Sequence, residues 1–113
     1  MNYTTAIAAA DELRLNSVPD EQKHRWIFEL ECRVSEMMGV DEPRYEFPSD
    51  CDLLLPEQHQ DVYVRYLVAM IDHYNGEDEL YTNDRVVFED AFADACGWWI
   101  RHHRPKSAGN WRV

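Results

Sequence analysis

The densest group of potential metal ligands lies in IDHYNGEDELYTND, residues 71–84, where an Asn-Gly pair interrupts an apolar helical pattern and four acids occur within the next eight residues. A calcium loop needs side-chain oxygen ligands at positions 1, 3, 5 and 12 and glycine at position 6. With Gly76 at position 6, Ile71, His73 and Thr82 occupy positions 1, 3 and 12, so three of the four ligands are wrong. We therefore interpret the segment as a helix end, followed by acids that suit the first turn of the next helix.

Other patterns that could do chemistry are equally incomplete. His102 and His103 are adjacent and so lie on different helix faces, and no HExxH motif or pair of histidines four residues apart is present. The sequence also has no GxSxG, P-loop or GxGxxG motif. Two pairs of carboxylates could act as acid and base, Glu29 with Glu36 and Glu89 with Asp94, but acids on helix faces of an acidic protein are usually solvated. We predict no catalytic residue, no metal site and no cofactor, and hence not an enzyme.

The cysteines and the overall composition indicate a folded domain in a reducing compartment. Cys32, Cys51 and Cys96 are odd in number and widely spaced, which favours reduced thiols over a disulfide framework or a zinc site. A length of 113 residues suits one domain, and 45% hydrophobic and 12% aromatic residues are too many for a disordered chain. No apolar run is long enough for a membrane span and no export signal is evident, so we expect a protein that is cytosolic or released by lysis, not exported, and has no membrane partner.

Charge is divided unevenly along the chain. All 22 acids lie in residues 1–100, whereas the last thirteen residues, RHHRPKSAGNWRV, hold four of the eleven Lys and Arg and no acid. An acidic body with a basic end favours contact between unlike surfaces of neighbouring copies, and it argues against a body that grips nucleic acid. For the tail itself the open interpretations are a small nucleic-acid contact and, favoured over it, a disordered C-terminus or one ordered only by a partner.

Hydrophobic spacing predicts four helices. A short helix spans residues 4–14 with Thr4 or Thr5 as N-cap, and a second starts near Ser17 and Pro19 and ends at Gly39, with Glu29 and Arg33 in contact on its surface. Residues 40–56 form a long connection with apolar anchors. A third helix opens at Pro56, and a fourth runs from beyond Gly76 to about His103, with a kink or recapping at residues 82–84.

These elements predict an all-α fold: a small bundle of three main helices plus a short N-terminal helix, with a long loop between the second and third helices. Residues 1–103 are expected to form a single helical domain and residues 104–113 a basic C-terminal tail. The apolar stripes place the following residues in the core: Trp26, Ile27, Leu30, Val34, Tyr66, Leu67, Met70, Phe88, Phe92 and Trp99.

Three segments resemble a known family: DEQKHRWIFELECRVSE at 20–36, LLLPEQHQDVYVRYLVAMIDHYNGEDELYTND at 53–84, and FEDAFADACGWWIRHHRPK at 88–106. Together they are similar to the small head-tail connector or head-completion proteins of tailed phages and prophages of Gram-positive bacteria. The most specific parts are the Arg25-Trp26 helix and the stretch from Ile71-Asp72 to Asn75-Gly76-Glu77. The chain departs from that family at Asn83-Asp84, where relatives often have Asn-Ser, and beyond Lys106.

The resemblance implies an all-α protein that forms a ring, commonly of twelve copies, on the portal vertex, and helps to close the filled head and join the tail. Its partners are then other copies of itself, the portal protein and a neighbouring neck or tail-completion protein, with DNA at most passing through the ring, whose lumen would be acidic. Its location is the virion neck, after assembly in the host cytoplasm. The alternative is a small acidic phage-encoded regulatory or inhibitory protein, acting as a nucleic-acid mimic. On either view the candidate partner-binding residues lie in the 40–56 loop and the tail: Tyr45, Phe47, Leu53, Leu54, Arg101, Arg104, Lys106, Trp111 and Arg112.

Overall fold

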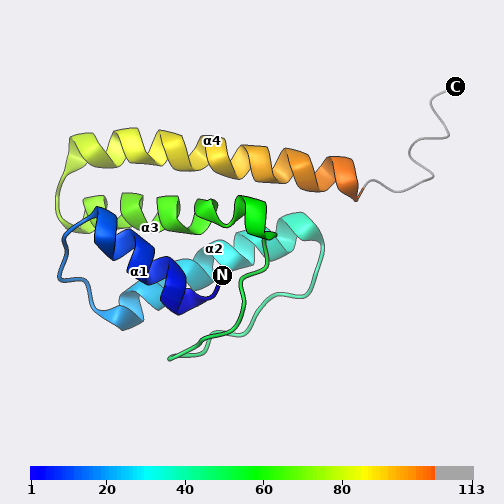
Figure 1. The fold of residues 1–113 in the computed structure, drawn as a ribbon, viewed down its shortest axis with the longest axis horizontal. Helices are drawn as coiled ribbons and strands as arrows, with labels where there is room; N and C mark the ends of the chain where they lie inside the picture. The colour runs from blue at the N-terminus through cyan, green and yellow to red at the C-terminus, as the bar shows by residue number, and fades with distance from the viewer. Residues whose placement is uncertain (104–113) are drawn as a thin grey trace, which may run out of the picture.

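The computed structural model describes residues 1–103, and this part of the chain is all-α, as predicted (Figure 1). Its elements are α1 (Tyr3–Leu13), α2 (Asp20–Met38), the short 3-10 helix η1 (Glu57–His59), α3 (Asp61–Tyr74) and α4 (Asp78–His102). Within residues 1–103 the only β-type pairing is an isolated antiparallel bridge between Asn2 and Asp52. The predicted tail, with Arg104, Lys106, Trp111 and Arg112, lies outside the described residues.

The start of α1 differs from the prediction. Asn2, not Thr4 or Thr5, is the N-cap, because its side-chain oxygen accepts a hydrogen bond from the Thr5 N–H at 2.9 Å. Thr4 instead donates to Asp50 at 2.8 Å, and the Leu53 N–H donates to the Met1 carbonyl at 2.9 Å. The N-terminus is thereby joined to the end of the long connection.

The predicted start of α2 at Ser17 is also wrong, whereas its predicted end is confirmed. The helix begins only at Asp20, because Pro19 has an extended backbone with ψ of 146°. It ends at Met38, and Gly39 follows with φ of 71°, a left-handed conformation in which its N–H bonds back to the helix.

Two further boundaries differ in detail. Pro56 opens η1 rather than a continuous helix, and α3 follows from Asp61. The chain turns at Asn75 and Gly76, and Gly76 has φ of 75°. No break occurs at residues 82–84, since α4 is continuous and the Thr82 hydroxyl donates to a carbonyl of its own helix.

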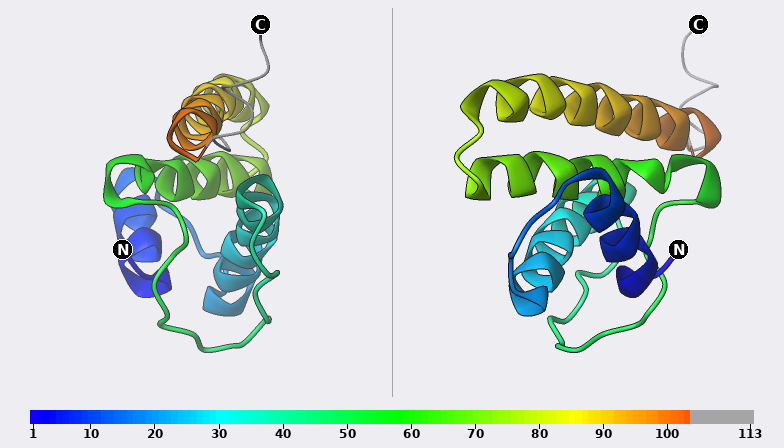
Figure 2. Two further views of the ribbon diagram at one scale, coloured as in Figure 1. Left: turned by 90° about the vertical axis from the view of Figure 1, so that its right-hand side faces the viewer. Right: turned by 60° about the vertical axis from the view of Figure 1, so that its left-hand side comes forward.

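Helix α3 occupies the middle of the molecule, with α4 on one side and α1 and α2 on the other (Figure 2). Because α3 buries side chains on both sides, its apolar stripe is wide and includes Val62, Tyr63, Val64, Leu67, Val68 and Ile71. Helix α4, by contrast, buries only Phe88 and Ala95 among its 25 residues and packs mainly on α3. In the described part of the chain no helix is long and apolar enough to cross a membrane.

Most of the predicted core residues lie where they were expected. Six are buried and three more pack against them while partly exposed: Trp26, Ile27, Leu30, Val34, Leu67 and Phe88 in the first group, and Tyr66, Met70 and Phe92 in the second. The exception is Trp99. It lies outside the core cluster, near the end of α4, where its ring stacks on His103 with centroids 3.4 Å apart.

Candidate interaction surfaces

The connection between α2 and α3 is fixed to the body at its second end. Leu53 and Leu55 are buried, and Leu54 is partly buried against the core. The backbone N–H of Leu54 donates to the carboxylate of Glu31 at 2.9 Å. Leu53 is 5% exposed and Leu54 packs against the core, so both of these predicted partner residues contribute mainly to packing within this chain.

A buried polar pair holds this end of the connection in place. The hydroxyl of Tyr63 on α3 donates to Glu31 on α2, and the same hydroxyl accepts from the Leu55 N–H at 3.1 Å. Burial raises the pKa of Glu31 above its ordinary value, and burial together with the Glu31 charge raises the pKa of Tyr63. Residue spacing does not predict this pair, because no helical or strand period joins positions 32 apart.

The middle of the connection is less enclosed. Phe47 is 41% exposed and contacts His24 edge-on, with ring centroids 4.8 Å apart. Tyr45 lies edge-on to Phe28 and under the Arg25 guanidinium, 4.7 Å from the ring centroid. Residues 40–56 hold five acids and one arginine, so we name this segment the acidic loop: Asp41, Glu42, Glu46, Asp50 and Asp52, with Arg44.

The end of α4 has the opposite character. Arg101, His102 and His103 are all exposed. The His102 ring stacks on Trp98 with centroids 4.4 Å apart, and one nitrogen of each histidine ring lies within hydrogen-bond distance of a carbonyl one turn earlier. We name residues 101–103 the basic end of α4. Arg101, which was predicted to bind a partner, is therefore accessible.

A groove separates the last turns of α2 from the second half of α4. It consists of two adjoining hollows of about 280 and 330 Å³ that share Glu36 and Met37. The lining is mainly apolar, and we name it the α2–α4 groove: Arg33, Glu36, Met37, Met38, Gly39, Phe92, Trp99, Ile100 and His103. Arg33 does not pair with Glu29 as predicted; it reaches Glu89 on α4 at 3.7 Å.

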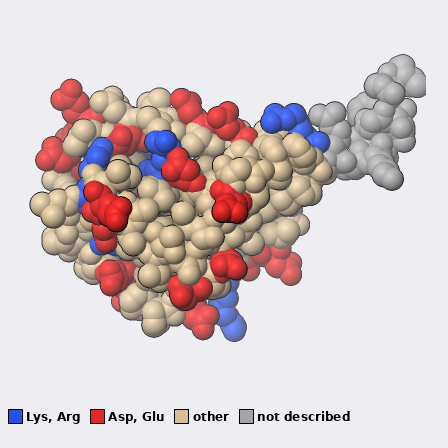
Figure 3. Space-filling view, viewed as in Figure 1, with Lys and Arg blue, Asp and Glu red and all other residues tan. Residues whose placement is uncertain are grey.

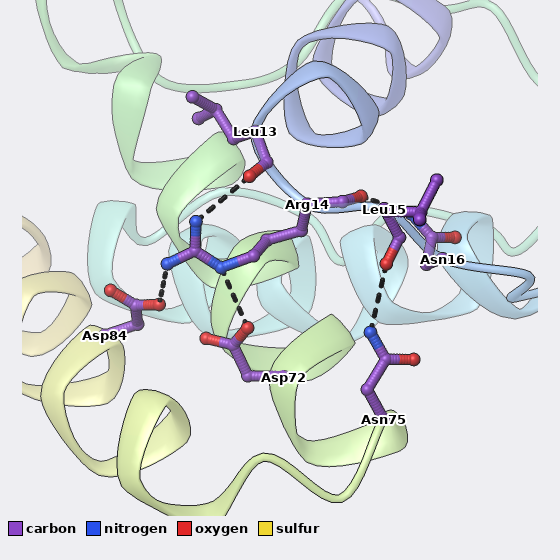
Figure 4. Close-up of polar contacts among 7 residues, drawn as sticks. All are labelled: Leu13, Arg14, Leu15, Asn16, Asp72, Asn75 and Asp84. Atoms are coloured by element: carbon purple, nitrogen blue, oxygen red, sulfur yellow. Dashed lines mark hydrogen bonds and ion pairs between the residues drawn. The ribbon is translucent and has the colours of Figure 1, made fainter.

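Arg14 joins three helices at the other end of the molecule (Figure 4). It donates from Nε to Asp72 on α3 at 2.9 Å and from Nη2 to Asp84 on α4 at 2.7 Å. Close by, the Asn75 side chain donates to the Leu15 carbonyl at 3.1 Å. Asp72 and Asp84 both lie in the 71–84 segment that was tested as a calcium loop, and they bind the Arg14 guanidinium instead.

The two carboxyl groups in this junction have opposite pKa shifts. Burial, and then the neighbouring Asp84 carboxylate, raise the pKa of Asp72 to about 6, although Arg14 opposes the shift. The pKa of Asp84 is lowered by the neighbouring Asp72 carboxyl group and by Arg14. Asp72 is 1% exposed, and one of its oxygens has no hydrogen-bond partner among the described residues. Of the two carboxyl groups, Asp72 is therefore the one that takes up a proton first as pH falls.

Acidic side chains are scattered over the face drawn in Figure 3, with few Lys or Arg between them. They do not gather in one patch there.

Among residues 1–103, no three His, Cys, Asp or Glu side chains lie close enough together to hold a metal ion. Comparisons of this chain with protein-family models, with curated proteins and with solved structures found no match.

Proposed function

We propose that the protein is a head-tail connector or head-completion component of a tailed phage or prophage. It binds the portal vertex as a ring of copies and helps to close the filled head and join the tail. The proposal starts from the resemblance of residues 20–36, 53–84 and 88–106 to that family. Its partners are itself, the portal protein and a neighbouring neck or tail-completion protein.

The observation that supports this function best is the presence of two unlike surfaces on one small helical scaffold. The acidic loop has a net charge of −4, from five acids and one arginine, and an exposed aromatic ring at Phe47. The basic end of α4 lies beside an apolar groove. A ring subunit must contact a neighbour on each side through two different surfaces, so unlike surfaces suit this role.

In this proposal the three longer helices form the scaffold and the 40–56 loop contacts partners. Arg14 and the Glu31–Tyr63 pair fix the scaffold, because each joins helices that are distant in sequence. The scattered acids of Figure 3 give no support to an acid-lined lumen on that face. In this proposal DNA at most passes through the ring. The same scatter gives no support to a nucleic-acid mimic, which needs acids in a phosphate-like row.

The test uses purified full-length protein and DNA-filled heads that carry the portal. We expect the protein to bind these heads and to reduce the leakage of DNA, measured as nuclease-sensitive DNA over time. Heads without portal are the control, and they should neither bind the protein nor be protected by it. Failure to bind portal-bearing heads, together with absence of the protein from virions, would overturn the proposal.

A further inference from the structure

We propose that the α2–α4 groove of one copy receives the acidic loop of a neighbouring copy, with Phe47 as the side chain that enters the groove. This inference rests on the proposed function, because it names the two surfaces that meet between subunits of the ring. It commits to a second copy of this chain as the occupant.

The groove has the composition of a site for an apolar side chain. Met37 and Met38 come from α2, and Phe92, Trp99 and Ile100 come from α4. Ile100 is 57% exposed, so a large apolar side chain faces water there. Methionine side chains are unbranched and adapt their shape to an incoming group, and aromatic rings supply contact area at a low entropic cost.

Phe47 is the matching feature of the acidic loop. It lies near the middle of residues 40–56, and 41% of its surface is exposed. Acids surround it in the sequence, with Glu46 before it and Asp50 after it. An exposed phenylalanine among solvated acids gains most from a neighbour that covers the ring and carries positive charge.

The charges around the groove fit this loop. Arg33 lines the groove, packed over Phe92 and paired with Glu89, and Glu36 is the one acid in the lining. The exposed Arg101 follows Ile100 on α4, and residues 101–113 hold four Lys and Arg and no acid. The acidic loop carries a net charge of −4, by the difference between five acids and one arginine. Unlike charges on the two surfaces steer the loop towards the groove and disfavour contact of either surface with itself.

The two surfaces lie too far apart to meet within one chain. Phe47 contacts His24 near the start of α2, while the groove is built on Met37 and Met38 at its end. The thirteen positions between His24 and Met37 correspond to about 20 Å along a helix. Figures 1 and 2 likewise place the connection between α2 and η1 on the side of the molecule away from α4. Contact between copies is then head-to-tail, which closes into a ring when the rotation permits.

The experiment places a photo-crosslinking residue, p-benzoylphenylalanine, at position 47 of the full chain. Benzophenone reacts readily with methionine C–H bonds, so we expect crosslinks to the Met37–Met38 pair. An equal mixture of ¹⁵N-labelled and unlabelled chains shows whether the joined peptides come from different copies. The crosslinking is done with concentrated free protein and with protein bound to portal-bearing heads, and the products are mapped by mass spectrometry.

A matched pair of variants tests the groove. Ile100→Glu places a charge in the groove and should reduce the intermolecular crosslink roughly tenfold or more, because burying a carboxylate among apolar groups is costly. Val86→Glu is the control, since Val86 is also on α4 and also 57% exposed but does not line the groove. It should leave the yield unchanged.

The results separate this inference from the proposed function. Crosslinks that stay within one chain, map to the portal or elsewhere on a second copy, or persist in Ile100→Glu overturn the loop-in-groove contact. The loop-in-groove contact is also overturned if no intermolecular crosslink forms, either with concentrated free protein or with protein bound to portal-bearing heads. If the protein still binds portal-bearing heads, the connector role stands without this contact. Crosslinks in the groove without any head binding would support the contact and count against the connector role.

Discussion

Replacing Arg14 with methionine should lower the free energy of unfolding by more than is usual for a partly exposed side chain. The substitution keeps an unbranched side chain of similar reach but removes the hydrogen bonds to Asp72 at 2.9 Å and Asp84 at 2.7 Å. Asp72 is 1% exposed and then has no cation beside it. The variant therefore leaves a buried carboxyl group without its compensating charge.

The magnitude follows from the exposure of the three groups. Removal of one partner from a fully buried ion pair costs about 3–5 kcal/mol. Arg14 is 30% exposed and Asp84 is 23% exposed, so water already screens part of the interaction. We expect a loss of about 2–3 kcal/mol in the free energy of unfolding near neutral pH, a large fraction of the roughly 5–15 kcal/mol typical of a domain.

The pH dependence gives this prediction its distinctive sign. Asp72 has a pKa raised to about 6 from an ordinary value of 3.8, so the folded state holds an extra proton in this window and loses stability as pH rises through it. Without Arg14 the pKa of Asp72 rises further, so the loss of stability with rising pH continues to a higher pH. The deficit of Arg14→Met should thus be largest above pH 7 and smaller near about pH 5, where Asp72 is protonated in the folded state of both proteins. The lowered pKa of Asp84 acts only below its ordinary value, outside this window.

Urea unfolding followed by circular dichroism at several pH values measures these quantities. Arg65→Met is the control, because Arg65 pairs with Asp61 within α3 while both side chains are 45–61% exposed, and its loss should cost no more than about 0.5 kcal/mol. Adding Asp72→Asn to Arg14→Met should recover part of the loss by removing the buried charge. A deficit below about 1 kcal/mol, or one that does not change with pH, would refute the reasoning about the buried carboxyl.

Four further predictions concern other positions. Trp26→Ala should lower the free energy of unfolding by about 3–5 kcal/mol in urea titrations, since Trp26 is 7% exposed; a loss under about 1 kcal/mol would place the ring outside the core. Glu31→Leu should cost about 2–4 kcal/mol, because the Tyr63 hydroxyl and a backbone N–H lose their acceptor, and an unchanged thermal midpoint would contradict this. Gly76→Ala should cost about 1–2 kcal/mol by calorimetry from its φ of 75° alone, as no atom lies within 4 Å of the added carbon; a neutral result would mean that the turn relaxes. Deleting residues 104–113 should leave the thermal midpoint unchanged and weaken binding to portal-bearing heads, whereas equal loss of stability would mean that these residues pack on the domain.

Local sequence patterns predicted the helices well and their first residues poorly. The spacing of Trp26, Leu30 and Val34 and the glycine at 39 were sufficient for α2, since a helix needs an apolar stripe and a left-handed end. The N-caps failed because several polar residues near each start could cap, and the choice depended on remote contacts. Thr4, for example, is engaged by Asp50, which leaves Asn2 to cap α1.

The contacts that join distant segments could not be predicted from one sequence. Arg14 lies 58 positions from Asp72 and 70 from Asp84, so no spacing rule connects them. The groove likewise forms only because α4 runs past the end of α2, which depends on how the helices pack. Hydrophobicity alone does not predict whether an apolar side chain is covered by its own chain. Leu53 was therefore expected at a partner surface but is buried, and Trp99 was expected in the core but lies outside it.

The difference in length between α3 and α4 has a consequence for local stability. Helix α3 has 14 residues and α4 has 25, corresponding to about 21 and 38 Å, so the far end of α4 extends beyond the helix on which it packs. Its last buried side chain is Ala95. Backbone amides beyond that point should exchange with solvent deuterium through small local openings, whereas those around Phe88 should exchange only through much larger ones. Hydrogen exchange along this one helix would then change from slow to fast within a few turns, so the end of α4 could unwind and reform while the rest of the domain stays folded.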